Sequence, residues 1–269
     1  MQQWRLIDTG YAGGFRNMAV DEAILLEHAA GNVPPTLRFY AWQPPTVTIG
    51  YFQDMKREID VEACQKAGFH YVRRLTGGRA ILHDVELTYS IVAREDNPVV
   101  SGTVLESYLK ISRGIVAGLA KLGIQAEIAS HVKKEKGTAA CFDSPSWYEI
   151  VFEGRKLVGS AQTRKHGVIL QHGSIPLSLD AEKLFSVLKF SNEGLRAKLA
   201  EKFKSQACAV NEVLGREVTY SQAVEAFTTG FAQGLGVSLE QQNLTPAEQE
   251  LAQKLEREKY NTEAWNFKR

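Results

Sequence analysis

Residues 73–83 read Arg-Arg-Leu-Thr-Gly-Gly-Arg-Ala-Ile-Leu-His, and the rest of the chain is organised around this stretch. Runs typical of β-strands precede it at 69–72 and follow it at 86–92. Its two glycines supply the positive-φ freedom of a tight turn, so the sequence predicts a compact turn between two strands. Its three arginines could hold phosphate or carboxylate oxygens in a fixed fork. A plain hairpin with solvated arginines is the structural alternative, and these residues alone leave both interpretations open.

Working outward, apolar spacing predicts the remaining elements. Helices are expected at 17–30, 60–67 and 103–122, and strands at 37–42, 47–51, 124–129, 148–152, 156–162 and 167–175. Asp21 and Glu22 are expected to suit the positive end of the first helix. After Asp180 the pattern turns helical and polar. Thr245 and Glu248 predict a capping box at the start of a last helix.

The order of these elements predicts the α+β class. Strands dominate residues 36–176, and short turns such as 153–155 favour pairing that is mainly antiparallel. No linker divides the sequence, so we expect one catalytic domain over 1–269, with a core at about 33–245 and a short helical C-terminal tail.

Composition excludes several classes of function. Lys+Arg 32 against Asp+Glu 31 leaves a formal charge of +1, which does not favour a nucleic-acid or membrane-surface partner. No apolar run reaches the roughly 20 residues of a membrane span, and residues 1–5 lack a signal-peptide core. Three cysteines far apart indicate neither a disulfide framework nor a zinc site. We therefore expect a cytoplasmic protein with free thiols.

One cysteine is a candidate nucleophile. Cys64 and Cys208 lie in settings that are ordinary for buried structural thiols, whereas Cys141 lies at a junction between a loop and a strand. A thiol with a pKa near 8.5 needs an activator at neutral pH. Lys156 opens a strand of small and apolar residues, and its ammonium could lower the thiol pKa and hold a carbonyl oxygen. A strand-end lysine that reaches to water is the alternative.

The histidines do not predict a metal centre. His166 and His172 lie six residues apart without a carboxylate or thiol partner in the sequence pattern, so we reject a metal site. The pair could equally be one buried and one surface histidine. His83 remains a polar candidate for substrate positioning.

Four blocks of sequence together resemble one family. They are the stretch quoted above, Ala-Cys-Phe-Asp-Ser-Pro-Ser-Trp-Tyr-Glu-Ile at 140–150, Gly-Arg-Lys-Leu-Val-Gly-Ser-Ala-Gln at the start of 154–175, and Glu-Lys-Tyr-Asn-Thr-Glu-Ala-Trp-Asn-Phe-Lys-Arg at 258–269. They resemble the lipoate–protein and biotin–protein ligase superfamily, and within it the Gram-positive octanoyl-carrier-protein:protein N-octanoyltransferases. The similarity runs from about Trp4 to the C-terminus. It implies a class II synthetase-like fold, with a mixed, mainly antiparallel sheet flanked by helices.

The resemblance also implies a reaction. Octanoate would pass from acyl carrier protein to Cys141 as a thioester, and then to a lysine of a lipoyl domain such as the glycine-cleavage H protein, with no ATP, metal or other cofactor. This is the first step of lipoate assembly. Lys156 would lower the pKa of Cys141 and orient the acyl carbonyl. Substrate contacts are expected from Arg73, Arg74, Thr76, Gly77, Gly78, Arg79, His83, Gly159, Ser160, Ala161 and His172.

Three alternatives stay open. An ATP-dependent lipoate–protein ligase usually carries a third glycine where this chain has Arg79, and often a further C-terminal domain. An amidotransferase that moves octanoyl or lipoyl groups between lipoyl domains would use nearly the same chemistry. A non-catalytic binder of acyl carrier or lipoyl domains would be expected to lack Cys141 or Lys156. We expect a monomer, since both substrates are themselves proteins.

Overall fold

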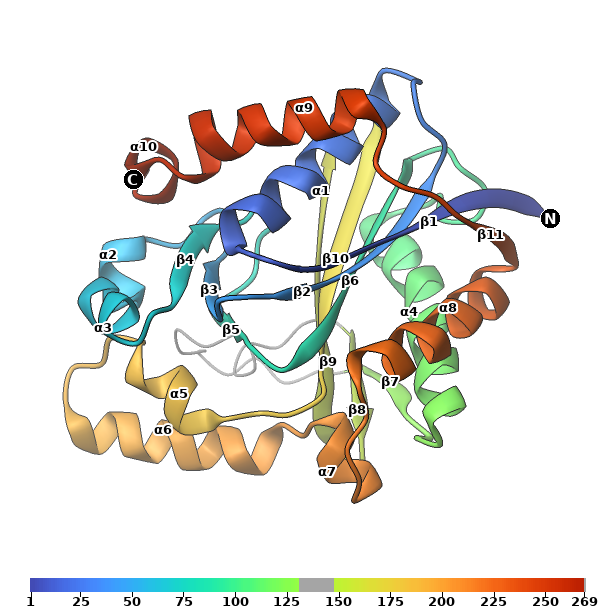
Figure 1. Cartoon of the computed structure of the whole chain (residues 1–269). Helices are drawn as coiled ribbons and strands as arrows, with labels where there is room; N and C mark the ends of the chain where they lie inside the picture. Colours follow the sequence, from blue (N-terminus) through green and yellow to red (C-terminus); the bar gives the residue numbers. More distant parts are fainter. Residues whose placement is uncertain (131–147, 269) are drawn as a thin grey trace.

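An eight-stranded sheet runs through the middle of the molecule (Figure 1). The computed structural model describes residues 1–130 and 148–268. Its strand order is β11-β1-β2-β6-β10-β9-β8-β7; β1 pairs parallel with β11 and β2, and all other neighbours are antiparallel. The strands are β1 (Gln2–Ala12), β2 (Thr36–Trp42), β6 (Glu86–Arg94), β7 (Glu127–Ser130), β8 (Tyr148–Phe152), β9 (Arg155–Lys165), β10 (Val168–Pro176) and β11 (Val237–Gln241). The predicted α+β class with a mixed, mainly antiparallel sheet is confirmed.

Helices cover both faces of this sheet. α1 (Gly14–Ala29) and α9 (Pro246–Leu255) pack on one face (Figure 1). α4 (Val104–Leu122) and α8 (Tyr220–Leu235) pack on the other. Alternation along the strands sorts the side chains: in β2, Leu37 and Phe39 join the α4–α8 core, whereas Tyr40 and Trp42 join the α1 core.

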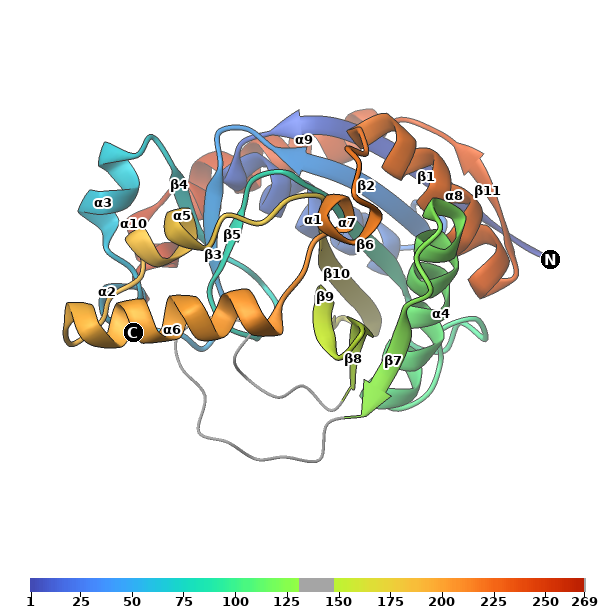
Figure 2. The ribbon, with the colours of Figure 1, turned by 90° about the horizontal axis from the view of Figure 1, so that it is seen from below.

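A second sheet of three short strands stands beside the first. β3 (Thr46–Ile49) is its centre and pairs parallel with β4 (His70–Arg73) and antiparallel with β5 (Ile81–His83). Four helices gather at this end of the molecule, away from α4 and α8 (Figure 2): α2 (Met55–Glu58), α3 (Val61–Lys66), α5 (Ala181–Ser186) and α6 (Glu193–Gln206). The remaining elements are α7 (Val210–Leu214), the π-helical turn η2 (Glu256–Tyr260) and α10 (Glu263–Asn266).

The hairpin expected around the glycine stretch does not form. The strands on its two sides belong to different sheets, and β3 lies between β4 and β5. The glycines pack against a distant segment instead, since a Cβ built on Gly50 would lie 2.1 Å from the carbonyl oxygen of Gly78. Gly78 itself has φ +94, which favours glycine. The alternative of solvated arginines is also wrong, because Arg73 and Arg74 are buried.

The first helix starts earlier than predicted, and this changes the role of its acids. α1 begins at Gly14, so Asp21 and Glu22 lie beyond its first turn. Asp21 is buried and pairs with Arg38 of β2, with 2.6 Å between Oδ1 and Nη1. Glu22 pairs with Lys259. The expected interaction with the helix dipole is therefore replaced by specific ion pairs.

The core extends beyond the 33–245 range expected from sequence. Trp4, Ile24 and Tyr260 are all fully or almost fully buried. β1 occupies an inner position of the large sheet, between β11 and β2. Arg5 of β1 forms a buried ion pair with Glu248 of α9, so both ends of the described chain are integral to the fold.

Two local predictions are confirmed. Thr245 and Glu248 form the capping box at the start of α9. β8 and β9 form an antiparallel hairpin whose turn holds Glu153 and Gly154 at positive φ. Within the described ranges, we find no helix with both the length and the apolar character needed to cross a bilayer.

Candidate functional site

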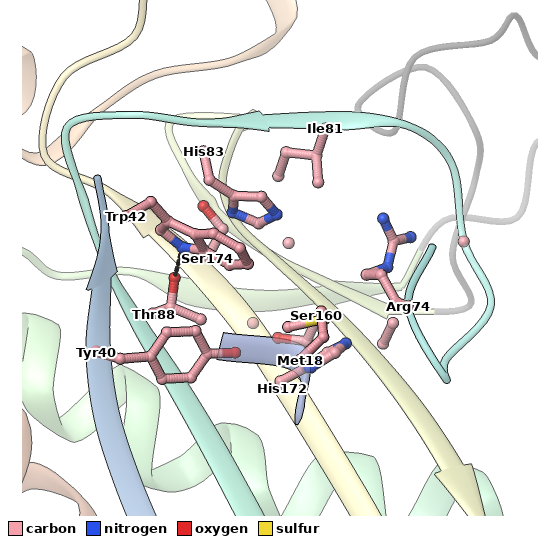
Figure 3. A pocket seen from close by; sticks show the side chains of 14 residues that line it. Met18, Tyr40, Trp42, Arg74, Ile81, His83, Thr88, Ser160, His172 and Ser174 are labelled. Carbon is pink, nitrogen blue, oxygen red and sulfur yellow. Dashed lines mark hydrogen bonds between the residues drawn. The ribbon is translucent and has the colours of Figure 1, made fainter. Parts of the chain in front are cut away.

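A pocket lies on the α1 face of the large sheet, at its junction with the small sheet (Figure 3). The space between its walls, including the part that is open to solvent, is about 430 Å³. A row of cross-strand neighbours forms its floor, from Gly159 on β9 through Ser174 on β10 and Thr88 on β6 to Tyr40 on β2. The full lining is Met18, Tyr40, Trp42, Arg74, Gly78, Ile81, His83, Thr88, Gly159, Ser160, Ala161, His172, Gly173 and Ser174.

Arg74 connects the glycine stretch to the pocket wall. Its Nη2 donates to the carbonyls of Gly77 and Arg79, at 2.8 and 2.9 Å. Its Nη1 donates to the carbonyl oxygen and the hydroxyl of Thr48 on β3. The fixed fork of the guanidinium therefore sets the shape of the loop, and the Arg74 side chain also faces the pocket.

His172 is held by a buried carboxylate. Its Nδ1 lies 3.1 Å from Asp21 Oδ2, and its Nε2 lies 2.7 Å from the hydroxyl of Thr76. Burial raises the pKa of Asp21, but the charge of Arg38 and the hydrogen bonds from His172 and Ser90 outweigh it and leave that pKa below its usual value. Burial lowers the pKa of His172. The pair is thus an ionised aspartate and a neutral imidazole that donates from Nδ1 and accepts at Nε2.

A second carboxylate–histidine pair lies on the neighbouring wall. His83 Nδ1 donates to Glu86 Oε1 at 2.9 Å, and Ser174 Oγ donates to Oε2 at 2.7 Å. Burial raises the pKa of Glu86, yet His83 and the hydrogen bonds from Ser174 and Thr88 leave it below its usual value. The indole of Trp42 stacks on the His83 ring at 4.1 Å and donates to the Thr88 hydroxyl. Hydrogen bonds therefore lock most polar side chains of the pocket.

Lys156 is buried, which excludes the alternative of a lysine that reaches to water. Its Nζ lies 2.7 Å from Glu149 Oε1, and both side chains are about nine-tenths buried. Its Cε lies 4.0 Å from the position that a Cβ on Gly159 would occupy. Gly159 lines the pocket and Lys156 does not, so this contact places the stem of the Lys156 side chain beside the β9 end of the pocket.

The candidate nucleophile Cys141 lies outside the described residues. The other two thiols are buried, as the sequence predicts. Burial raises the pKa of Cys64 to about 12 and that of Cys208 to about 11, so neither is a thiolate at neutral pH.

Arg73 does not line the pocket, contrary to the expectation of a substrate contact. Its guanidinium donates to six backbone carbonyl oxygens, three in the 50–53 loop and three in the C-terminal segment 265–268. Its backbone N–H donates to Asn266 Oδ1, and the Trp265 indole donates to its carbonyl. Arg73 therefore connects the 50–53 loop to the C-terminal segment 265–268. No polar group of substrate is needed to account for these bonds.

Of five other predicted substrate contacts, two line the pocket and three do not. Gly78 and Ala161 line the pocket, whereas Thr76, Gly77 and Arg79 lie outside its lining. Thr76 still acts on the pocket by binding His172. The alternation of β9 directs the Ser160 hydroxyl to the opposite face of the sheet, where it accepts from Tyr89 at 2.8 Å. Ser160 can therefore offer the pocket only its backbone.

The predicted histidine pair splits into two environments. His172 is buried in the pocket wall, and His166 is exposed at the turn between β9 and β10. The described residues hold no group of three His, Cys, Asp or Glu side chains that could bind a metal ion.

Several pocket residues were missed by sequence reasoning. They are Met18, Tyr40, Trp42, Ile81, Thr88, Gly173 and Ser174. One signal in the sequence bears on them: Asp21 lies between apolar residues of the predicted helix, Ala19 and Val20 before it and Ala23 after Glu22, and a buried acid needs a partner. Strand pairing brings the others together, and the sequence pattern does not give that pairing.

The sequence matches the family described as the lipoyl protein ligase A/B catalytic domain over residues 14–232. Curated relatives span almost the same length. An octanoyltransferase LipM of Geobacillus kaustophilus is 51% identical over 273 residues, covering 99% of this chain and 98% of the relative. That of Moorella thermoacetica is 53% identical, covering 98% and 97%, and that of Bacillus subtilis is 46% identical, covering 100% and 99%.

Solved structures share the fold over nearly the whole chain. The bipartite lipoate protein ligase of Thermoplasma acidophilum superimposes with a TM-score of 0.83 at 27% identity, covering 99% of this chain and 97% of that one. A lipoate-protein ligase A bound with ATP gives a TM-score of 0.80 at 26% identity, covering 99% and 98%.

Proposed function

The chain belongs to the lipoyl protein ligase A/B catalytic-domain family and is an octanoyltransferase, and we propose that it takes octanoate from acyl carrier protein onto Cys141 and passes it to a lipoyl-domain lysine. The observation that carries this proposal is the end-to-end similarity to curated octanoyltransferases. The acceptor in this proposal is a lipoyl-domain protein such as the glycine-cleavage H protein.

The chemistry of the proposed steps balances without ATP. The Cys141 thiolate attacks the thioester carbonyl of the donor, forms a new thioester and releases the thiolate of the carrier. One thioester replaces another, so the free energy of this step is close to zero. The lysine amine of the acceptor then attacks the enzyme thioester, forms an amide and releases the Cys141 thiol. Because one covalent intermediate links the two steps, one acyl slot serves two protein substrates in turn.

The pocket suits the octanoyl chain. The small residues Gly159 and Ala161 leave space above the sheet, and Met18 and Trp42 supply apolar walls. Lys156 stands at the β9 end, where an ammonium could hold the thioester carbonyl. The acyl carbonyl is therefore proposed to lie near β9, with the alkyl chain directed toward β2.

Two substitutions test the proposed role of Lys156, because they should shift the pH profile of Cys141 alkylation in opposite directions. In this proposal Lys156 lowers the pKa of the Cys141 thiol, and the Glu149 carboxylate beside it acts against that effect. Lys156→Met should shift the pH profile of Cys141 alkylation upward, and Glu149→Gln should shift it downward. If both variants keep the profile of the unmodified protein, the activating role is wrong.

The first experiment is intact-protein mass spectrometry with octanoyl-acyl carrier protein and no ATP. A gain of one octanoyl group, removable by hydroxylamine and absent in Cys141→Ala, is expected. Transfer of octanoate by Cys141→Ala would refute the thioester mechanism. Modification of a lipoyl domain only with octanoate and ATP would identify a ligase. Loading from an octanoylated lipoyl domain, and not from the carrier, would identify an amidotransferase.

We further propose that the protein is a monomer and acts in the cytoplasm, together with its proposed substrates, acyl carrier protein and a lipoyl-domain protein. Sedimentation velocity tests the monomer, and a concentration-dependent dimer would contradict it.

A further inference from the structure

Three lysines gather on an aromatic surface beside the glycine stretch. Lys268 Nζ lies 3.9 Å from the ring centroid of Tyr51 and 3.8 Å from that of Trp265. Lys259 Nζ lies 4.0 Å from the Trp265 centroid, and Lys165 Nζ lies 5.3 Å from the Tyr51 centroid. At these distances an ammonium is attracted to the face of an aromatic ring. Lys165, Lys259 and Lys268 are called the lysine cluster below.

The lysine cluster holds more positive charge than neighbouring carboxylates balance. The whole chain has a formal charge of only +1, so general basicity does not account for this concentration. Within residues 1–130 and 148–268, Glu22 is the only carboxylate that pairs with a cluster lysine, and its partner is Lys259. Burial lowers the pKa of Lys259, and the charges of Lys165 and Lys268 lower it further, against the effect of Glu22. An anion bound by Lys165 and Lys268 would relieve this repulsion.

The aromatic surface contacts the loop that lines the pocket. The Tyr51 N–H donates to the carbonyl of Thr76 at 2.8 Å, and the Phe52 ring lies 4.0 Å from the position that a Cβ on Gly77 would occupy. The next residue, Gly78, lines the pocket. Phe52 is 67% exposed, so this surface is open to solvent. The glycine stretch therefore connects the pocket to the surface that carries the lysine cluster.

One face of β9 also leads from the pocket to the lysine cluster. Gly159 and Ala161 line the pocket, and the pairing of β9 with β10 is regular from Gly159 to Lys165. Alternate residues of a strand share a face, so Lys165 lies on the same face as Gly159. The six residues between them span about 20 Å at roughly 3.3 Å per residue. The proposed site of the acyl carbonyl, beside Gly159, is therefore about this far from the cluster.

The proposed acyl donor carries an anion at a matching distance from its thioester. The thiol of an acyl carrier protein ends a phosphopantetheine arm, and a phosphodiester joins this arm to the protein. About thirteen bonds separate the phosphorus from the sulfur, which is roughly 16–17 Å in an extended chain. A lysine side chain adds about 6 Å of reach, which covers the remaining distance. Ammonium groups bind phosphate through charge-assisted hydrogen bonds.

We infer that Lys165 and Lys268 bind the phosphate of the donor's phosphopantetheine arm and hold the arm along β9 while its thioester lies at Gly159. The inference rests on the proposed function, which supplies the donor and the position of the carbonyl. It also gives the two protein substrates different contacts, because the acceptor lysine carries no phosphate.

Two small donors that differ only in the phosphate test the inference. They are octanoyl-pantetheine and octanoyl-phosphopantetheine, and the readout is the second-order rate constant for loading octanoate onto the protein, followed by mass spectrometry. The unmodified protein should prefer the phosphorylated donor by about 10-fold or more, a usual effect of hydrogen bonds to charged groups. The double variant Lys165→Met/Lys268→Met should lose most of this preference. High salt should reduce it in the unmodified protein.

Two further variants control for charge and for general effects of substitution. Lys268→Arg keeps the charge and should keep the preference for the phosphorylated donor. Lys121→Met is the matched control, because Lys121 is an exposed lysine at the end of α4, which covers the opposite face of the large sheet. Equal loading of the unmodified protein by both donors would overturn the inference. An unchanged preference in the double variant, or an equal loss in Lys121→Met, would also overturn it.

Binding without transfer separates this inference from the proposed function. Phosphopantetheine should raise the melting temperature more than pantetheine does, and the double variant should lose the difference. If neither thioester loads the unmodified protein but this difference is present, the proposed reaction is wrong and the phosphate site stands. If both load it equally, the reaction stands and the phosphate site is wrong. Stronger stabilisation by ATP than by phosphopantetheine, lost in the double variant, would assign the lysine cluster to a nucleotide and overturn the inference.

Discussion

Replacing Arg73 by methionine separates the two roles that this residue could have. Three of its six carbonyl bonds, to Tyr51, Gln53 and Asn266, are 2.9 Å or shorter. At a net value of about 1–1.5 kcal/mol each, these three bonds predict a loss of about 3–5 kcal/mol in the free energy of unfolding. At about 2–4 °C per kcal/mol for a chain somewhat shorter than this one, the melting temperature should fall by about 10 °C.

Urea unfolding followed by tryptophan fluorescence measures this loss, and hydrogen exchange locates it. The amide of Tyr51, which donates to Thr76 at 2.8 Å, should exchange faster in Arg73→Met. Arg113→Met, on the exposed side of α4, is the control and should change stability by no more than about 0.5 kcal/mol. A stable Arg73→Met protein with a raised KM for the acyl donor would refute the reasoning and restore the substrate contact expected from sequence.

Three further predictions concern stability at low pH, the cost of a side chain at Gly173, and the reactivity of Cys64 and Cys208. The folded pKa values of His172, Asp21 and Glu86 lie below the ordinary 6.5, 3.8 and 4.5, so the unfolded chain binds more protons. Stability should therefore fall as the pH drops from about 6.5 toward 4, and a flat urea-midpoint profile would contradict this. Gly173→Ala would put a Cβ 2.5 Å from Ser160 Oγ and 2.5 Å from the Tyr89 ring, and should cost about 1–3 kcal/mol in a thermal melt, whereas Gly194→Ala in the exposed helix α6 should not destabilise. Cys64 and Cys208 should resist iodoacetamide at pH 8 until urea unfolds the chain; rapid native labelling of either would contradict their burial.

The local part of the fold could be predicted because its signals lie within a few residues. The capping box of Thr245 and Glu248 and the hairpin turn at 153–155 each depend on neighbours in sequence. Burial of Cys64 and Cys208 follows from the apolar residues beside them. In each case the stabilising interaction is local, so the pattern is sufficient.

The candidate site could be predicted only in part, because its roles depend on long-range pairing. Gly78, Ala161 and His172 line the pocket as expected, but the register of β9 against β10 turns Ser160 to the other face. A one-residue difference in register reverses the face of every side chain in a strand, and the sequence pattern does not fix it here. Arg73 does not line the pocket, and the carbonyls that its guanidinium binds lie 20–23 and 192–195 positions away in the sequence. No neighbouring residue therefore indicates that this guanidinium is occupied.

The hydrogen bonds that Arg73 makes to two distant backbone segments also affect the order in which the chain folds. They join the 50–53 loop to residues 265–268, a contact 192 positions apart in the case of Trp265. Contacts of such long sequence separation carry a large loop-closure entropy and form late. Once β3 pairs with β4, Nη1 of Arg73 can already donate to the carbonyls of the 50–53 loop, but its Nε and Nη2 gain their acceptors only when the last segment docks. Fraying of that segment would therefore leave three N–H groups of a buried guanidinium without these acceptors, so opening of the C-terminal end of the described chain should weaken the packing around Arg73.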